Sequence, residues 1–340
     1  MEKQRKIRVL VVDDSPVSRE MIARGIPADP LIEVAATAKD PFEARDKILE
    51  VHPDVITCDV EMPQMNGVEF IRQLLPQYYI PVIVVSAVSD AVFTALEAGA
   101  VDFVVKPGTH APQDMDRFIQ DLTQKIKAAS RAKAPLFKPE RAPGGKAGNS
   151  GRGSDLIAIG ASTGGTEAIY SILHALTPEV PGIVIVQHIP PLFSRMFAER
   201  LDAQTPLRVK EARSGDYVEP GKALIAPGDR HVKIKKIGGR YQVECFEGNK
   251  VNGHCPSVDV LFESVAQETG SRAIGIILTG MGYDGAKGLL SMRRKGCRTI
   301  GQDEASAVVY GMPKVAYDIG AVEIQTSIEN IPRKIFELLG

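Results

Sequence analysis

Short β-branched runs, each the length of one strand, alternate with stretches that carry apolar residues at helical spacing. The run Ile7–Val12 is continuously apolar, as expected for a strand covered on both faces. Ser15 and Pro16 then have the character of a helix cap and first helical residue. Further runs are IEVAAT, DVITCD, IPVIVVSA and VDFVVKP. This alternation predicts a doubly wound parallel sheet over the first ~125 residues.

A second α/β pattern begins after Asp155. The apolar runs LIAIGAS, GIVIVQH and AIGIILTG each break into Gly, Ser, His or Asp. Between them, Gly238 and Gly239 are flanked by the alternating segments VKIKKI and RYQVECF, which predicts a β-hairpin. We therefore expect an α/β protein of two doubly wound domains with mainly parallel sheets, the second including a hairpin.

The two patterns are separated by a segment of different composition. From Ala128 to Gly153 the chain is dominated by Pro, Gly, Ala and basic residues, with little that could pack in a core. Such a composition is typical of a tether. The expected organisation is a first domain at 1–127, a linker at 128–154 and a second domain at 155–340.

Composition narrows the class of protein. Apolar residues make up 44% and charged residues 24%, as in average globular proteins. The formal net charge of -1 provides no general attraction for nucleic acid or anionic membranes. No apolar run approaches the ~20 residues of a membrane-spanning helix, and the N-terminal segment does not resemble a signal peptide.

The four cysteines are scattered, with no C-x-x-C pair. This pattern favours isolated reduced thiols in a cytoplasmic protein over a structural zinc site. We expect a cytoplasmic protein with no membrane insertion and no nucleic-acid partner.

Polar residues gather at the predicted strand ends of the first domain. Asp13 and Asp14 follow the first strand, Asp59 ends DVITCD, Ser86 ends IPVIVVS and Lys106 follows VDFVV. Open α/β sheets bind ligands at the carboxyl ends of their strands. Clustered carboxylates need a hard cation, and Mg²⁺ prefers oxygen ligands. With the charge neutralised, Asp59 could attack a phosphoryl donor, and Ser86 could bind a phosphoryl oxygen.

Three of these motifs resemble the receiver domains of two-component response regulators. They are the acidic pair, the pattern D-x-x-M-P-x-M-x-G at Asp59–Gly67, and Lys106-Pro107. The resemblance covers residues 6 to 125 and implies a flavodoxin-like fold. It also implies a histidine kinase as phosphodonor.

The resemblance gives each residue a role. Asp13 and Asp14, with Asp59, would hold Mg²⁺, and Asp59 would be the phosphoacceptor. Ser86 would be the switch hydroxyl, in place of a threonine, and Lys106 the phosphate partner. Phe103 occupies the position of a rotameric aromatic residue, although a core phenylalanine explains it equally well.

The second domain carries a serine, a histidine and an aspartate at predicted strand ends. Ser162 lies on the glycine-rich turn of IAIGASTGG, which by itself more often binds a nucleotide phosphate and matches neither G-x-S-x-G nor a Walker loop. His188 ends GIVIVQH, and Asp284 follows IILTGMGY. A serine nucleophile needs a histidine base, which an aspartate orients. We interpret His52, His110 and His174 as incidental.

Six segments resemble the bacterial chemotaxis protein-glutamate methylesterases in content and order. They are GASTGG, QHIP, APGDRH, PSVDVLF, LTGMGYDGA and QDEASAVVYGMPK, and they span nearly all of residues 155 to 320. The resemblance implies a Rossmann-like domain that hydrolyses glutamate methyl esters on chemoreceptors and deamidates certain glutamines, without a soluble cofactor.

In that family pattern Ser162 would be the nucleophile, His188 the base and Asp284 its orienting acid. The backbone N–H of Met281 would be an oxyanion donor, and the Thr163 hydroxyl would lie close to the histidine. We expect PSVDVLF and QDEASAVVYGMPK only to shape the cleft and the sheet edge.

Two hypotheses from different classes follow. The first is a hydrolase activated by phosphorylation of Asp59, with chemoreceptors as substrates. The second is a response regulator whose GASTGG turn binds a nucleotide or small ligand without hydrolysis. A DNA-binding regulator is disfavoured by the neutral charge.

Overall fold

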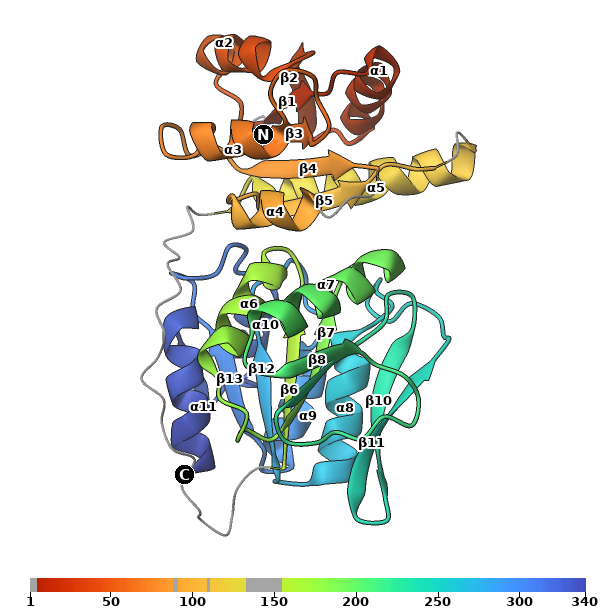
Figure 1. Cartoon of the computed structure of the whole chain (residues 1–340), viewed down its shortest axis with the longest axis vertical. Coiled ribbons are helices and arrows are strands. Elements are labelled where there is room, and N and C mark those ends of the chain that lie inside the picture. Colours follow the sequence, from red (N-terminus) through yellow and green to blue (C-terminus); the bar gives the residue numbers. More distant parts are fainter. Residues whose placement is uncertain (1–4, 88–90, 109–110, 133–154) are drawn as a thin grey trace. The chain divides into compact units, whose positions relative to one another are not determined.

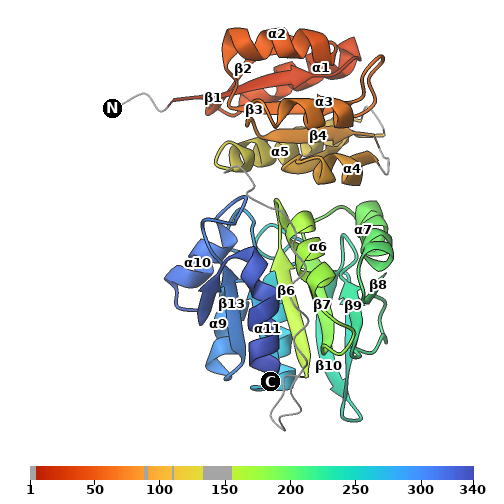
Figure 2. The same ribbon diagram turned by 60° about the vertical axis from the view of Figure 1, so that its left-hand side comes forward.

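The computed structural model describes residues 5–87, 91–108, 111–132 and 155–340. The chain divides into two compact units, Met1–Ala134 and Pro135–Gly340, which Figures 1 and 2 show from two sides. Among the described residues, no helix combines the length and the apolar character needed to cross a membrane.

The first unit is a five-stranded parallel sheet in the order β2-β1-β3-β4-β5. Its strands are β1 (Ile7–Val12), β2 (Ile32–Ala38), β3 (Val55–Asp59), β4 (Val82–Ser86) and β5 (Asp102–Val105). Its helices are α1 (Pro16–Gly25), the 3₁₀ turn η1 (Ile26–Ala28), α2 (Pro41–Val51), α3 (Gly67–Leu74), α4 (Ala91–Glu97) and α5 (Pro112–Ala129). The predicted doubly wound parallel sheet is confirmed.

Local sequence determines where these helices begin. Ser15 caps α1 by accepting a hydrogen bond from Ser18 N, with Pro16 in the first turn, as the sequence predicts.

In Figure 1, α1 and α5 lie on one side of the sheet and α2 and α3 on the other. Helices on both faces explain why the central strands are continuously apolar.

Helix α5 extends to Ala129, two residues into the range predicted as linker. Ala128 and Ala129 are both buried. The alanine-rich composition suggested a tether, but alanine also has the highest helix propensity. Alanines that can pack against the rest of the unit therefore extend the helix by these two residues.

The second unit contains a seven-stranded sheet in the order β14-β13-β12-β6-β7-β9-β8 and the separate hairpin β10-β11. Its strands are β6 (Leu156–Ala161), β7 (Gly182–Gln187), β8 (Arg208–Glu211), β9 (Lys222–Ile225), β10 (His231–Ile237), β11 (Arg240–Phe246), β12 (Ala273–Ile277), β13 (Arg298–Gln302) and β14 (Ile324–Thr326). Its helices are α6 (Gly165–Ala175), α7 (Pro191–Gln204), α8 (Val258–Thr269), α9 (Ala286–Arg294), α10 (Met312–Asp318), the 3₁₀ turn η2 (Ile328–Asn330) and α11 (Ile331–Leu339).

All pairings within the seven-stranded sheet are parallel, and the hairpin is antiparallel. The hairpin turns at Gly238 and Gly239, both with positive φ, as the sequence predicts. Helix α6 contacts α7 and α11, and helix α9 contacts α8 and α10, so the sheet is covered on both faces (Figures 1 and 2).

Each sheet has a topological switch point, where neighbouring strands connect onward to opposite sides of the sheet. In the first unit it lies between β1 and β3, and in the second between β6 and β12, with β9 inserted between β7 and the edge strand β8. The carboxyl ends of strands at such a switch point form the crevice that binds ligands in open α/β sheets. Both candidate sites lie at these ends.

Candidate functional site

The three aspartates of the first unit form one cluster. Carboxylate oxygens of Asp13, Asp14 and Asp59 all lie within 4.8 Å of one another. Lys106 Nζ lies 2.8 Å from Asp13 Oδ2 and 2.5 Å from Asp59 Oδ2. Ser18 Oγ also donates to Asp13 Oδ2 at 2.6 Å. The structure therefore brings together the acids and the lysine that the sequence placed at separate strand ends.

Burial and Lys106 shift the pKa of the Asp59 carboxyl in opposite directions. Burial raises the pKa of the Asp59 carboxyl, which the hydrogen bond and charge of Lys106 offset only in part. Burial by itself lowers the pKa of Lys106, but its hydrogen bonds to Asp13 and Asp59 outweigh this, so that the pKa is raised. The lysine is thus a permanent cation beside Asp59.

Ser86 is the last residue of β4, and Phe103 lies near the start of the neighbouring strand β5; both are buried. Within the described chain, Ser86 Oγ is a buried hydroxyl without a hydrogen-bond partner. Such an atom, at the end of the strand next to that of Asp59, is available to a ligand oxygen. Phe103 packs edge-on against Phe93, with ring centroids 6.3 Å apart, and lies under Lys125 Nζ. In this structure Phe103 is therefore a core residue.

The loop after Asp59 passes very close to the strand end. A Cβ added at Gly67 would lie 2.2 Å from the carbonyl oxygen of Asp59, which explains the glycine of the D-x-x-M-P-x-M-x-G pattern. Asn66 caps α3 by accepting a hydrogen bond from Glu69 N at 2.9 Å. The cap and the glycine together fix the path of the loop over the acidic cluster.

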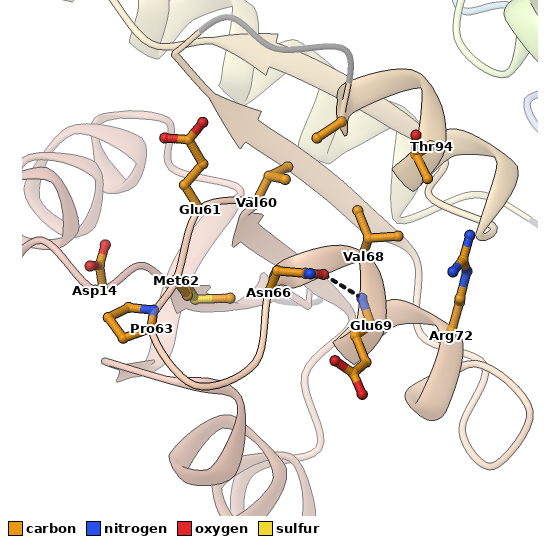
Figure 3. Close-up of a pocket in the computed structure, with 11 residues that line it drawn as sticks. Asp14, Val60, Glu61, Met62, Pro63, Asn66, Val68, Glu69, Arg72 and Thr94 are labelled. Carbon is orange, nitrogen blue, oxygen red and sulfur yellow. Dashed lines mark hydrogen bonds between the residues drawn. The ribbon is translucent and has the colours of Figure 1, made fainter.

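Beside the cluster lies an open groove of about 840 Å³. Figure 3 shows it between Asp14, the β3–α3 loop, α3 and the start of α4. Val60, Met62 and Val68 supply apolar lining, whereas Glu61, Glu69 and Arg72 supply charge. A ligand could therefore approach the acidic cluster from solvent.

Ser162 directly follows β6, at the switch point of the second sheet. Its N–H donates to Thr279 O at 3.0 Å, and its carbonyl accepts from Gly165 N at 2.7 Å and from Gln187 Nε2 at 2.9 Å. The side chain is largely buried. A Cβ added at Gly280 would lie 2.7 Å from Ser162 Cβ, so only glycine lets the β12–α9 loop approach the serine this closely.

His188 and Asp284 are in direct contact. His188 Nε2 lies 2.9 Å from Asp284 Oδ2, and both side chains are buried. In the part of the chain that the structure describes, His188 Nδ1 is a buried atom without a hydrogen-bond partner, and Ser162 is not bonded to it. The sequence pair His188 and Asp284 is thus brought together, while the hydroxyl of Ser162 is placed on the neighbouring strand end without a hydrogen bond to the ring.

Asp284 is held as an anion by several donors. Burial alone would raise its pKa, but hydrogen bonds from His188, Asn252 and Ser257 hold that pKa well below its usual range. The first backbone N–H groups of α8 add to this set, because Val258 N donates to Oδ2 at 2.7 Å. An N-terminal helix end favours negative charge, so the carboxylate stays ionised.

Two residues with no predicted role, Asn252 and Ser257, hold the carboxylate of Asp284. Asn252 Nδ2 donates to Asp284 Oδ1 at 2.8 Å and to Asp259 Oδ2 at 2.7 Å. Ser257 Oγ donates to Asp284 Oδ1 at 2.7 Å. The signal was present in the Asn-Gly dipeptide at 252–253, which is typical of a tight turn. PSVDVLF therefore does more than shape a sheet edge, since it anchors Asp284.

The loop that approaches Ser162 is held by hydrogen bonds with the segment 302–314, QDEASAVVYGMPK. Gln302 Oε1 accepts a hydrogen bond from Thr279 N at 2.8 Å, and Thr279 Oγ1 accepts one from Val309 N at 2.9 Å. Thr279 Oγ1 also donates to Thr163 O at 3.0 Å. These contacts fix the backbone immediately before Met281. Among residues 155–340, the N–H of Met281 itself makes no hydrogen bond to Ser162. The Thr163 side chain is buried, but only its carbonyl is held by a contact to this loop.

Two protein-family models match the chain. The model for the CheB methylesterase matches residues 157–335, and that for the response regulator receiver domain matches residues 9–118.

Curated relatives resemble the chain along nearly its whole length. The protein-glutamate methylesterase/protein-glutamine glutaminase 2 of Syntrophomonas wolfei is 55% identical over 339 residues, which cover 98% of both chains. The corresponding protein of Salmonella typhimurium is 45% identical over 335 residues, covering 97% of this chain and 96% of that protein. Among solved structures, the CheB methylesterase catalytic domain of Thermotoga maritima is 38% identical with a TM-score of 0.53, covering 54% of this chain and 98% of that one.

Proposed function

Because the chain belongs to the CheB methylesterase family and carries a response regulator receiver domain, we propose that it works through a Ser162–His188–Asp284 triad under the control of Asp59. Membership of this family makes it an enzyme of the protein-glutamate methylesterase and protein-glutamine glutaminase class. The observation that carries the triad is the 2.9 Å contact between His188 Nε2 and Asp284 Oδ2, at the strand end beside Ser162.

This contact assigns the two ring nitrogens. With Nε2–H donated to the ionised Asp284, Nδ1 of His188 is the basic nitrogen and the atom left for Ser162. Hydrogen bonds between base and nucleophile are often long before substrate binds. The absence of one here among the described residues is compatible with the role.

The reaction proceeds by acyl transfer. His188 Nδ1 takes the proton of Ser162 Oγ as Oγ forms a bond to the side-chain carbonyl carbon of the substrate. The same proton then passes to the departing oxygen or nitrogen, which leaves as methanol or ammonia. A water molecule, deprotonated by Nδ1, attacks the acyl-enzyme, releases glutamate and restores the serine.

The oxyanion that forms in each step needs donors. We assign this role to the backbone N–H of Met281, because the adjacent Gly280 approaches Ser162 closely and the preceding Thr279 is braced on both sides. The Thr163 hydroxyl is assigned a supporting position near His188.

In the receiver unit, Asp59 is the proposed phosphoacceptor. The oxygens of Asp13, Asp14 and Asp59 form a hard donor set that suits Mg²⁺, which when bound would neutralise charge on the phosphoryl oxygens. Lys106 provides a second cation at Asp59, and the unpartnered Ser86 hydroxyl would bind a phosphoryl oxygen.

The substrates, the phosphodonor and the cellular location are proposed from membership of the family. The substrates are methyl-accepting chemoreceptors, the phosphodonor is a chemotaxis histidine kinase, and the chain acts in the cytoplasm without nucleic acid or membrane insertion. We propose 1–127 as the receiver domain, 128–154 as the linker and 155–340 as the catalytic domain. In the unphosphorylated state the receiver lowers the activity of Ser162.

Methanol release from a methylated chemoreceptor tests the triad. Ser162→Ala should abolish it, whereas Ser171→Ala, a buried serine on α6, should leave it intact. A fluorophosphonate should label the wild-type chain but not His188→Ala. Full activity in Ser162→Ala would refute the triad. Saturable nucleotide binding, with no labelling of Ser162, would instead support the ligand-binding module.

A further inference from the structure

A second histidine lies against the proposed base. The ring of His254 is stacked on that of His188, with centroids 3.7 Å apart and planes inclined by only 6°. His254 belongs to neither the triad nor the oxyanion site. It comes from the turn between β11 and α8.

The turn that carries His254 is tightly fixed. Val251 N donates to His254 O at 2.9 Å and His254 N donates to Val251 O at 3.0 Å, and the two central residues have φ of 54° and 85°. Positive φ at both central positions is what a type I′ turn requires, and Asn-Gly is its preferred sequence. The turn presents Asn252 to Asp284 and His254 to His188, so it holds both members of the pair.

His231 anchors the chain on the far side of the turn. This side chain is 1% exposed. Its Nδ1 accepts a hydrogen bond from Ser257 N at 3.2 Å and its Nε2 donates to Asn249 O at 2.9 Å. Both ring nitrogens are therefore used within the protein, and the His231 ring serves to hold residues 249–257 in place.

His254 is uncharged at the pH where the base operates. Burial, and then the neighbouring His188, lower the pKa of His254 to about 4, with Lys250 acting in the same direction and Asp284 opposing it. A neutral ring does not compete with His188 for the proton of Ser162. Its π face attracts a positive charge placed over it.

We propose that His254 is a positioning residue for hydrolysis: its neutral ring, stacked on His188, keeps Nε2 on Asp284 and Nδ1 on the side of Ser162, and stabilises the imidazolium that forms when Ser162 loses its proton. The proposal rests on the proposed function, because it takes His188 as the base. It deepens that function by adding a residue that acts through the base.

The experiment compares three replacements in the full chain. His254→Phe keeps a flat ring that cannot be protonated, whereas His254→Ala and His254→Gln remove the ring. His174→Ala, a histidine on α6, is the control. The measurements are kcat and KM for hydrolysis of a peptide carrying a glutamate γ-methyl ester between pH 6 and 9, with thermal unfolding of each variant.

We expect His254→Ala and His254→Gln to lower kcat about 10-fold or more, with KM within about twofold of the wild-type value. A misaligned base slows the chemical step but does not weaken substrate binding. His254→Phe should recover kcat to within about threefold of wild type at every pH. Equal loss in the Phe and Ala variants would overturn the proposal, since a ring nitrogen would then be required. So would unchanged kcat in both His254→Ala and His254→Gln.

Two controls keep the result decisive. If His254→Ala unfolds at the assay temperature, the comparison of His254→Gln with His254→Phe carries the test alone. Fluorophosphonate labelling of the wild-type chain is scored first. If it does not occur, or survives in His188→Ala, the proposed function itself fails, whereas a failure confined to the His254 variants leaves that function intact.

Discussion

At the scale of single residues, the buried carboxylate of Asp284 organises the catalytic unit. It accepts hydrogen bonds from a ring, an amide, a hydroxyl and the backbone at the start of α8. The same amide, that of Asn252, also donates to the buried Asp259, whose pKa is raised by burial. A neutral donor thus lies between two buried acids, while His188 contacts the other carboxylate oxygen of Asp284 and His254 stacks on His188.

Asn252→Asp should destabilise the catalytic unit. The change replaces the shared donor by a third carboxylate beside Asp259 and Asp284, which should lower the free energy of unfolding at pH 7.5 by about 3 kcal/mol. The loss should shrink as the pH falls toward 5, because protonation removes the repulsion. Urea unfolding at the two pH values measures it. Asn249→Asp, the same change at an exposed position, should have little effect.

His254 should make the stability of this unit depend on pH. Its pKa is lowered to about 4 from 6.5, so between these values the unfolded chain binds a proton that the folded chain does not. Stability contributed by the neutral ring is complete above pH 6.5 and is lost as the pH falls toward 4. Relative to His254→Phe, wild type should lose about 2 kcal/mol between pH 7.5 and 5. Hydrogen exchange of α8 amides measures this loss, and parallel pH profiles for the two proteins would contradict the prediction.

At the scale of elements, close backbone approaches place each functional loop. Gly67 lets the β3–α3 loop cross the carbonyl of Asp59, and Gly280 lets the β12–α9 loop reach Ser162. Helix α8 then directs its N-terminal N–H groups at Asp284. In both units a glycine permits a close backbone approach beside a candidate functional residue: at Asp59 within the β3–α3 connection, and at Ser162 from the loop that follows β12.

Gly67→Ala should disrupt the phosphoacceptor site. Its new Cβ would lie 2.2 Å from the carbonyl oxygen of Asp59, a backbone atom that cannot move aside as a flexible side chain would. We expect Mg²⁺-dependent phosphorylation of the full chain by acetyl phosphate to fall about 10-fold or more, with an unfolding cost of about 1–3 kcal/mol. Gly108→Ala is the matched control, because nothing lies within 4 Å of its added Cβ. Equal phosphorylation of the two variants would show that the loop tolerates the displacement.

At the scale of the whole molecule, two parallel sheets each carry the proposed functional residues at a switch point. The first sheet places Asp13 and Asp59 on adjacent strands, and the second places Ser162 between the strands that lead to His188 and Asp284. One chain thus contains a receiver domain and a methylesterase domain, and phosphorylation at Asp59 is the proposed link between them.

Asp59→Asn should separate regulation from catalysis. Acetyl phosphate with Mg²⁺ should stimulate methanol release by the wild-type chain about 5–100-fold, the usual range of coupling between sites. Asp59→Asn should keep the basal rate and fluorophosphonate labelling and lose the stimulation. A fragment beginning at Asp155 should be as active as the phosphorylated chain with or without the donor. If this fragment only matched the unstimulated chain, inhibition by the receiver would be wrong.

The sequence by itself determined the two α/β patterns, the hairpin and the candidate residues, because strand burial, helix caps and turn glycines are local properties of the chain. It placed Asp59, Ser162, His188 and Asp284 at strand ends, and a parallel sheet brings such ends to one edge. Only the tertiary structure decided which nitrogen of His188 meets Asp284, and that His254 stacks on the base. Those contacts join loops far apart in the chain, and a ring orientation depends on packing that no local pattern encodes.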